Sequence, residues 1–367
     1  MVILWASTFQ VIWKIVKKEN MKKYIAEIPM ADRIQKEEEF YAKDFLMSYS
    51  GLSKLAFSPV NFYMHYVMNQ REDSYDKNML EGSLIHCLLL NPEQFDENFV
   101  ISIDDLPSEN AKNVIHMIFN HFKELKKSGD TRENLDEFQE AIIDALVDVN
   151  LYQSLKTDAQ RVEKILIPKN IAYFDYLKKA VGRSVIDDTV YNFCTAVVDK
   201  IKNNPIVMDT MGFFSDSFNQ LEKYNELQLV KFGHSEHFGL RGIIDNLVID
   251  TVGKEIRIND LKKTGKSITQ FRDSIDYFKY YLQAAMYKKL VEHVYLSQPQ
   301  YADYNIVFRF IVVDPFMQIA SIKVKPETLT EWEVTLDAEI AKADYHFETK
   351  NFELPYEFLQ NNNEIEI

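Results

Sequence analysis

Three charged residues in the second half of the chain have types and spacing suited to metal-assisted chemistry. Asp245 lies within an apolar, β-branched stretch over 240–250. Asp260 and Lys262 lie two positions apart at the end of the next such stretch. Residues two apart on a strand share a face, so a hairpin would bring both carboxylates side by side with the lysine. Close carboxylates raise each other's pKa unless a cation lies between them, and the spacing therefore predicts an Mg²⁺ or Mn²⁺ site.

Lys262 extends this chemistry to phosphates. A lysine beside a bound metal can hold a phosphate oxygen or orient a metal-bound water, as phosphodiester hydrolysis requires. An isolated set of two aspartates and a lysine is more often a group of exposed turn residues. The interpretation therefore depends on residues elsewhere in the chain.

Gln283 and Tyr287 are four residues apart on a helix predicted from Asp276 to about Val294, so they share a face. The apolar stripe of this helix is one position away and leaves both residues at the edge of the buried side. That stripe comprises Phe278, Leu282, Met286 and Leu290. By themselves, a glutamine and a tyrosine at such an edge indicate ordinary hydrogen bonds.

Gly82 and His86 are also four apart, in the segment GSLIHCLLLNPEQF over 82–95. The glycine suggests that the helix approaches another backbone closely, which would let His86 reach the metal site. A lone histidine on an apolar helix is more often a structural residue.

Five stretches of the chain together resemble the PD-(D/E)XK nuclease superfamily. Within it, they are most similar to the RecB-like branch and to the exodeoxyribonuclease VIII type of phages and prophages. The stretches lie in patches from about Gly51 to about Phe347 and are LAFSPVNFYMHYV, GSLIHCLLLNPEQF, RGIIDNLVID, RINDLKKT and YFKYYLQAAMYKKL. Ile244 stands where many members have proline.

The resemblance implies a role for each candidate. Asp245 and Asp260 would bind metal with His86 and the Leu261 carbonyl, and Lys262 would assist the attacking water. Gln283 and Tyr287, which resemble the family's QxxxY motif, would line the active site and the DNA path. Three weaker candidates are Gly82, Arg241, which begins RGIIDNLVID, and Glu226. Glu226 is an acid on the preceding strand, and a metal ligand and a strand-end cap are equally good interpretations of it.

The activity implied by the resemblance is an Mg²⁺-dependent exodeoxyribonuclease, with Mn²⁺ as a substitute. It would degrade duplex DNA from its ends, 5′ to 3′, in phage-type recombination. A single-strand annealing protein and a homo-oligomeric ring around DNA are implied partners, in the cytoplasm of a bacterial host. An endonuclease or restriction-like nuclease with the same site is the enzyme alternative. A non-catalytic DNA-binding or scaffold protein on a nuclease fold is the other alternative.

Composition limits these options. The chain has 367 residues, a formal net charge of −14 and 46% hydrophobic residues, which fits a globular protein with a core. Its 2 cysteines exclude a disulfide scaffold and a four-cysteine zinc or iron–sulfur site. An acidic chain does not coat nucleic acid indiscriminately. Residues 254–279, however, hold seven basic and four acidic residues, consistent with a local DNA groove.

The periodicity of apolar residues along the chain predicts an α/β fold, with a small mixed sheet flanked by helices and a large helical N-terminal portion. Helices are expected near 113–127, 134–150, 185–205 and 326–347, and strands near 226–233, 240–250, 254–261 and 304–313. We predict four regions: an N-terminal extension over 1–30, a helical portion over 31–220 that contributes His86, a nuclease core over 221–350 and an acidic tail over 351–367.

Neither end of the chain is expected to contribute to the folded core. The apolar segment from Val2 to Val16 is too short to span a bilayer, and Lys14 lies inside it. A dispensable extension before Met21 explains it better than an interfacial helix, and no membrane contact is predicted. The tail after Phe352 is expected to fray.

Two motifs are set aside. Thr264 to Ser267 end like a P-loop, but Asp260 stands where the first glycine is needed. His234 and His237 are close enough to suggest zinc, but a polar hairpin tip is the better interpretation.

Overall fold

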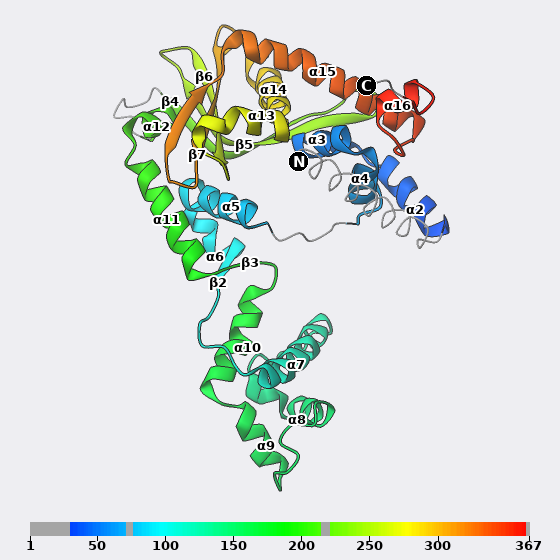
Figure 1. Ribbon diagram of the computed structural model, residues 1–367, viewed down its shortest axis with the longest axis vertical. Helices are drawn as coiled ribbons and strands as arrows, with labels where there is room; N and C mark the ends of the chain where they lie inside the picture. The colour runs from blue at the N-terminus through cyan, green and yellow to red at the C-terminus, as the bar shows by residue number, and fades with distance from the viewer. Residues whose placement is uncertain (1–29, 71–75, 214–220, 365–367) are drawn as a thin grey trace, which may run out of the picture.

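The computed structural model describes residues 30–70, 76–213 and 221–364. Figure 1 shows a body built around a β-sheet and a narrow arm of helices that projects from it. The strands of the main sheet are β1 (Phe45–Met47), β4 (Leu221–Lys231), β5 (Phe238–Asp250), β6 (Glu255–Lys263), β7 (Asn305–Val313) and β8 (Ile319–Lys323).

Helices cover both faces of this sheet. One side carries α3 (Tyr49–Phe57), α4 (Pro59–Phe62), α13 (Phe271–Phe278), α14 (Tyr280–Val291) and α15 (Pro326–Thr349), with α2 (Met30–Tyr41) and α16 (Tyr356–Gln360) beside them. The other side carries α5 (Lys77–Leu90), α6 (Phe95–Asn98), α11 (Asp188–Lys202) and α12 (Pro205–Thr210). Strand alternation separates the two cores, because Ile258 and Phe310 belong to the first and Leu261 and Ile311 to the second.

The sheet is mixed. β5 pairs antiparallel with β4 along one edge and with β6 along the other, β6 pairs parallel with β7, and β7 pairs antiparallel with β8. The β5–β6 ladder ends at the pair Asn246–Asn259. Beyond it, β1 pairs parallel with residues 238–240 of the same edge of β5. Residues 241–245 therefore lie in a fork between β6 and β1, where the edge of β5 has no partner strand among the described residues.

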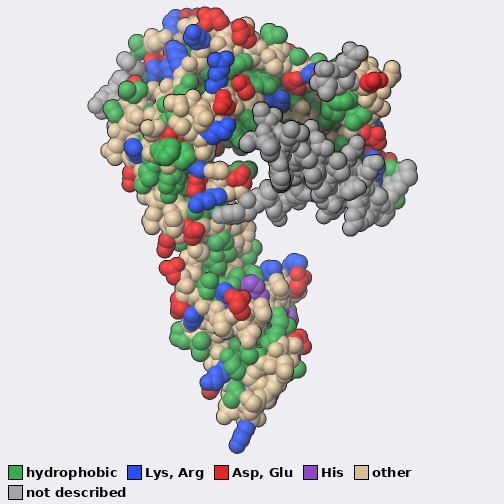
Figure 2. Space-filling model, viewed as in Figure 1, with side chains coloured by type: hydrophobic (Ala, Val, Ile, Leu, Met, Phe, Trp, Pro, Cys, Tyr) green, Lys and Arg blue, Asp and Glu red, His purple; other side chains and the backbone are tan. Residues whose placement is uncertain are grey.

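The arm has its own core. A short parallel pair, β2 (Phe99–Ile101) and β3 (Ser184–Ile186), leads to α7 (Glu109–Lys127), α8 (Gln139–Asp148), α9 (Asp158–Ile165) and α10 (Pro168–Ala180). Four phenylalanines, Phe119, Phe122, Phe138 and Phe174, make contacts in its interior. Both signs of charge are mixed over its outer surface in Figure 2.

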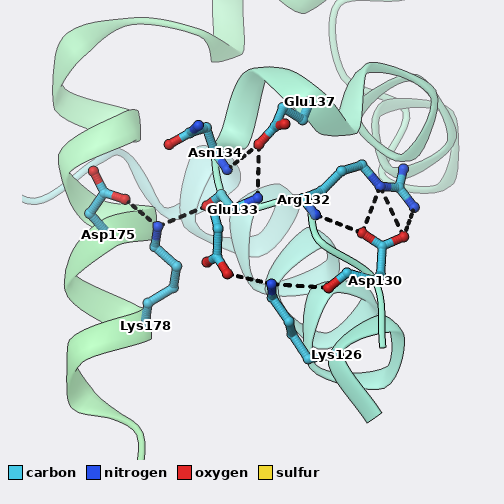
Figure 3. A network of polar contacts seen from close by, with 8 residues as sticks. All are labelled: Lys126, Asp130, Arg132, Glu133, Asn134, Glu137, Asp175 and Lys178. Carbon is cyan, nitrogen blue, oxygen red and sulfur yellow. Dashed lines mark hydrogen bonds and ion pairs between the residues drawn. The ribbon is translucent and has the colours of Figure 1, made fainter. Parts of the chain in front are cut away.

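Polar contacts join the turn after α7 to α10, as Figure 3 shows. The side chains of Asn134 and Glu137 form a capping box, in which Glu137 accepts from the Asn134 backbone at 2.7 Å. Arg132 pairs with Asp130 at 2.7 Å, and Lys178 of α10 donates to the Glu133 carbonyl at 2.8 Å. These partners all lie between residues 130 and 178, so the contacts that organise this part of the arm come from one continuous segment of the chain.

The predicted fold class is confirmed, with its mixed sheet, flanking helices and helix-rich N-terminal half. The four helices near 113–127, 134–150, 185–205 and 326–347 and the four predicted strands are present with shifted ends. The N-terminal half also supplies β1, β2 and β3, and β8 follows a turn, all short strands that were not predicted. The four predicted region boundaries stay a prediction.

Two expectations were wrong. The helix predicted from Asp276 to Val294 is broken at Lys279, whose left-handed backbone (φ 58°) separates α13 from α14. Phe278, assigned to the buried stripe of that helix, is consequently 49% exposed. The tail after Phe352 also does not fray as a whole, because Glu357 of α16 pairs with Lys342 at 2.6 Å.

The N-terminal expectations for residues 1–29 lie outside the described residues. Within the described ranges, none of the helices is both long enough and apolar enough to span a bilayer.

Candidate active site

The fork in the sheet places the two predicted aspartates at its apex. The last β5–β6 pair is Asn246–Asn259, so Asp245 and Asp260 are the next residues on the two diverging strands. Asp245 stays attached to β6 through its Oδ2, which accepts a hydrogen bond from the Leu261 backbone N–H at 2.7 Å. Both carboxylates are buried, and Asp260 is fully so. The predicted approach of these two strand ends is therefore present.

Glu226 comes to the same place from β4. The register of β4 on β5 sets Glu226 opposite Asp245, between the pairs Asn225–Asn246 and Leu227–Ile244. Its backbone has a φ of 49°, in the left-handed region that non-glycine residues rarely adopt. Such a conformation costs about 1–3 kcal/mol and is found where a functional site requires it. The structure thus favours the ligand interpretation of Glu226 over a strand-end cap.

His86 reaches the cluster from α5 on the other face of the sheet. Its Nδ1 lies 3.6 Å from Glu226 Oε1 and 3.6 Å from Asp245 Oδ1. Its Nε2 lies 2.9 Å from the Leu261 carbonyl, which can only accept, so Nε2 carries the proton. Burial lowers the pKa of His86, but the charge of Asp245 and a hydrogen bond with Glu226 outweigh it and raise that pKa to about 9.

A buried ion pair fixes α5 against the sheet. Lys263 of β6 pairs with Glu81 of α5 at 2.5 Å and donates to Asn78 at 2.6 Å. Both charged side chains are more than nine-tenths buried. Removing one partner of such a pair leaves an uncompensated buried charge, which is costly. The pair therefore fixes the position of α5, and with it the position of His86, relative to the strands.

Asp260 and Lys262 share a face of β6, as the two-residue spacing predicts. Lys262 Nζ lies 2.6 Å from Asp260 Oδ2, yet neither carboxylate oxygen has a well-oriented hydrogen bond. Burial raises the pKa of Asp260, Lys262 opposes this, and the nearby Asp245 raises it further. Burial lowers the pKa of Lys262, but the charges of Asp260 and Asp245 outweigh it, so the amine is held protonated.

The donor set fits a divalent cation. The ligand atoms of His86, Glu226 and Asp245 all lie within 4.8 Å of one another. One imidazole and two carboxylates suit Mn²⁺ and related ions, and carboxylate oxygens suit Mg²⁺. Asp260 adds a further acceptor beside this group, because its buried Oδ1 has no hydrogen-bond partner in the described structure while Oδ2 pairs with Lys262. The Leu261 carbonyl, expected as a ligand, is engaged by His86 instead, and its role as a ligand stays a prediction.

The predicted pair on α14 lies directly beside this cluster. Gln283 Nε2 donates to the Tyr287 hydroxyl at 3.0 Å, and both side chains are buried rather than at the edge. Burial and the charges of Asp245 and Asp260 raise the pKa of Tyr287 well above its usual value. A Cβ on Gly242 of β5 would come within 2.7 Å of the Tyr287 ring. Only glycine at 242 therefore lets this ring pack on the forked part of β5.

The structure places Arg241 at the fork but does not support the role predicted for Gly82. Arg241 is exposed at the fork and lines a cavity of about 320 Å³ together with Tyr287 and the N-terminal residues of α3. Gly82 faces open space, because a Cβ there would meet no atom within 4 Å. The close backbone approach predicted for Gly82 is therefore wrong. His86 reaches the site because the Lys263–Glu81 pair positions α5.

A row of asparagines lies beside the acidic row. Asn259 donates to Asn246 at 2.8 Å, Asn246 donates to Asn225 at 3.0 Å, and Asn225 donates to the Leu90 carbonyl at 2.9 Å. Asn259 and Asn246 also reach the carbonyls of Thr210 and Met211 at the end of α12. The row ties three strands to two helices one residue from Glu226, Asp245 and Asp260. The sequence analysis missed it, although buried asparagines at matching positions of adjacent strands were a readable signal.

Tyr280 was also missed. Lys262 Nζ lies 5.0 Å from the centre of the Tyr280 ring, at the first position of α14. A cation held over an aromatic face is stabilised without a second carboxylate. The helix break at Lys279, which places this ring, has no clear signature in the sequence.

The two set-aside motifs lie in the connections between regular elements. His234 and His237 lie in the turn between β4 and β5, and neither belongs to the metal-ligand group found in the described parts of the chain. Thr264 to Ser267 continue from β6 into the turn before α13, where the Thr264 hydroxyl accepts from the Lys266 backbone.

The sequence profile of the PD-(D/E)XK nuclease superfamily matches residues 46–352, a range that contains every residue of the cluster. Among solved structures, the chain is similar to a crystal structure from Eubacterium rectale named "Putative exonuclease". The identity is 12% and the TM-score 0.42, over 92% of this chain and 88% of that chain. No curated protein sequence matches the chain.

Proposed function

Because the chain belongs to the PD-(D/E)XK nuclease superfamily, we propose that it is a metal-dependent deoxyribonuclease, most simply an exonuclease acting on ends of duplex DNA. One observation carries the proposal. His86, Glu226 and Asp245 converge on one point, and the ammonium of Lys262 lies on the Asp260 side of the same fork. Metal ligands and a buried, protonated lysine together suit hydrolysis of a phosphodiester.

The metal would be held by Asp245, Glu226 and His86, with Asp260 beside them. A divalent cation there would lower the pKa of a bound water and would offset the negative charge of the phosphate. The Leu261 carbonyl fixes the tautomer of His86, so its Nδ1 lone pair faces the carboxylates whenever the ring is neutral. The Leu261 N–H holds Asp245 so that Oδ1 remains directed to the same point.

Lys262 would act on the water and the phosphate. Asp260 and the Tyr280 ring hold its ammonium in place, so little conformational entropy is lost when substrate arrives. A fixed positive charge in a buried site stabilises the negative charge that develops on the phosphate.

Gln283 and Tyr287 would contact the substrate strand. The Tyr287 hydroxyl accepts from Gln283, so its own proton is available to a phosphate oxygen. The Gln283 carbonyl oxygen is buried and has no hydrogen-bond partner in the described structure, which suits a group that completes its contacts with substrate or water.

The finer features come from the family resemblance alone. We propose Mg²⁺ as the physiological ion, 5′ to 3′ polarity, a ring-shaped homo-oligomer and a role in phage-type recombination with an annealing protein. An endonuclease would use the same cluster, and resistance of circular DNA to cutting separates it from an exonuclease. A non-catalytic DNA-binding protein is favoured instead if calorimetry shows no Mn²⁺ binding.

The test is cleavage of linear duplex labelled at either the 5′ or the 3′ end, with Mg²⁺, by wild type and Lys262→Ala. We expect label release by wild type and a loss of at least about 100-fold in the variant. Lys156→Ala is the control, because Lys156 is an exposed lysine of the arm, which holds none of the candidate catalytic residues. Equal cleavage by wild type and Lys262→Ala, or no cleavage by wild type with either Mg²⁺ or Mn²⁺, would contradict the proposal.

A further inference from the structure

A series of aromatic rings leads from Lys262 to the protein surface at the break between α13 and α14. The Lys262 ammonium lies 5.0 Å from the Tyr280 ring, which stacks on Phe278 at 5.4 Å and 23°. Phe278 in turn contacts Tyr277 edge to face at 4.9 Å. The inner end is anchored, because Tyr280 also packs on the buried rings of Phe271 and Phe310. The outer end is open: Tyr277 is 78% exposed and Phe278 49%.

The backbone holds these rings at the surface at some energetic cost. Lys279 has a left-handed conformation, which is unfavourable for a residue with a side chain, and it stops α13 directly after the two rings. The Tyr49 hydroxyl of α3 donates to the Phe278 carbonyl at 2.5 Å and fixes this end of the helix. The break turns Tyr280 toward the core and leaves Tyr277 and Phe278 outside it, and a strained backbone conformation of this kind is found at functional sites.

The chemistry of the surrounding side chains selects the occupant. Arg272, Asp273 and Asp276 are exposed on the same short helix, so local charge does not favour a phosphate-binding site. Two exposed ring faces, continuous with a ring beside the catalytic lysine, instead suit the flat faces of bases. Stacking of bases on aromatic side chains is tolerant of sequence, because every base has a flat aromatic face.

We propose that Tyr277 and Phe278 form a stacking platform for unpaired bases of the DNA strand that enters the site. The inference rests on the proposed function and makes it more specific. It assigns the enzyme a single-stranded segment next to the scissile phosphate, and so a preference for frayed or tailed ends over blunt ones. The rings position the strand and take no part in the chemistry.

The first test measures binding without cleavage. A fluorescent single-stranded oligonucleotide is titrated in EDTA with wild type, Tyr277→Ala and Tyr277→Phe, and again with a matched oligonucleotide of abasic residues. We expect Tyr277→Ala to weaken binding of the normal oligonucleotide about tenfold, equivalent to ~1.4 kcal/mol, and to leave binding of the abasic one unchanged. Tyr277→Phe should bind like wild type. Phe316→Ala is the control, since Phe316 is a 72% exposed ring in the turn between β7 and β8.

Several results would overturn the platform. These are unchanged binding by both Tyr277→Ala and Phe278→Ala, an equal loss on the abasic oligonucleotide, or an equal loss in Phe316→Ala. Sedimentation of each variant tests whether the rings instead contact a second copy of the chain. If Tyr277→Ala dissociates an oligomer, the rings form such a contact and the proposal is overturned.

Cleavage assays separate this proposal from the nuclease proposal. If wild type cleaves and Tyr277→Ala loses only its preference for tailed over blunt duplex, both proposals stand. If wild type cleaves and the variant keeps that preference, the platform is wrong and the nuclease proposal stands. If wild type does not cleave but base-dependent binding is lost in the variant, the nuclease proposal fails and the platform is retained as a binding site.

Discussion

The body and the arm of the molecule are stabilised in different ways. In the body, strands separated by up to 278 positions in the numbering, from Phe45 in β1 to Lys323 in β8, form one sheet. That sheet buries charged and amide groups, including Asp245, Asp260 and Asn246. In the arm, α7 to α10 come from one continuous stretch, and the buried side chains are apolar or aromatic apart from Asn170, whose amide donates to the Ile165 carbonyl at 2.9 Å. All candidate catalytic residues lie in the body, and none lies in the arm.

This difference indicates where stability was given up for function. The fork leaves one edge of β5 without a partner strand over residues 241–245 in the described structure, holds Glu226 in a left-handed conformation and buries Asp260 with Lys262 as its ion-pair partner. Each feature lowers stability by an amount that an ordinary core would avoid. The arm has no such fork, and none of its described carboxylates is buried. Its left-handed non-glycine residues, Asn150 and Tyr152, lie in the connection between α8 and α9, and its helices are capped by local side chains such as Ser108, Asn134 and Thr157.

Replacing Asp245 by asparagine should have the largest effect on activity. Asparagine keeps the size and can still accept from the Leu261 N–H, but it removes the negative charge shared with Glu226 and His86. We expect cleavage to fall by at least about 100-fold. The melting temperature should change little, because Asp260 loses a repulsive neighbour while His86 and Lys262 lose an attractive one. Asp158→Asn in the arm, which removes an exposed pair with Arg161, should leave both unchanged. A stable but fully active Asp245→Asn protein would remove the distinction between the two regions.

Removing one buried ring from each region should show whether the body and the arm unfold independently. Phe174→Ala in the arm and Phe308→Ala in the body each remove a fully buried ring, at a cost of about 3–5 kcal/mol. We expect Phe174→Ala to increase hydrogen exchange over residues 109–180 only and to leave Mn²⁺ binding intact. Phe308→Ala should increase exchange across the sheet and weaken Mn²⁺ binding. Uniform exchange in both variants would mean that body and arm unfold as one unit.

Asn259→Ala tests whether buried amides maintain the site. The substitution leaves the Asn246 side-chain oxygen and the Thr210 carbonyl without their donor, at about 1–3 kcal/mol. Because the row lies one residue from the acidic row, we expect weaker Mn²⁺ binding as well as a lower melting temperature. Asn203→Ala removes an exposed amide that bonds only within its own helix turn, and it should change neither. If Asn259→Ala lowers stability but leaves Mn²⁺ affinity unchanged, the row has no role in positioning.

The smallest expected effect is an acid dependence of the arm. Hydrogen bonds from Arg132 lower the pKa of Asp130 to about 2, below the ~3.9 of an unfolded aspartate. A depressed pKa stabilises the folded arm above about pH 4, and that contribution is lost as the pH falls toward 2. Pepsin cleavage within 103–183 should therefore rise less steeply in this window for Asp130→Asn than for wild type. An equal pH dependence in the two proteins would show that this exposed pair contributes nothing measurable.

Much of the fold could be predicted from sequence because its signals are local. Periodicity and capping residues gave α7, α11 and α15, and β-branched runs between turns gave β5, β6 and β7. The failures have physical causes. β1, β2 and β3 have three residues each, too short for a period to be visible. The break at Lys279 interrupts an apolar pattern that continues through it, and the chain there follows a tertiary hydrogen bond from Tyr49.

The sequence by itself determined which residues could form a metal site. Residue type and the two-residue strand period made Asp245, Asp260 and Lys262 candidates, whereas the resemblance to the PD-(D/E)XK superfamily selected His86, Gln283 and Tyr287. Only the tertiary structure decided how these residues meet. It places Glu226 with Asp245 and His86, pairs Asp260 with Lys262, and sets Tyr280 and the rings beyond it beside the fork. The reason is that residue type and spacing act within one strand or helix, whereas strand divergence, a left-handed residue and a buried ion pair arise only when distant segments pack together.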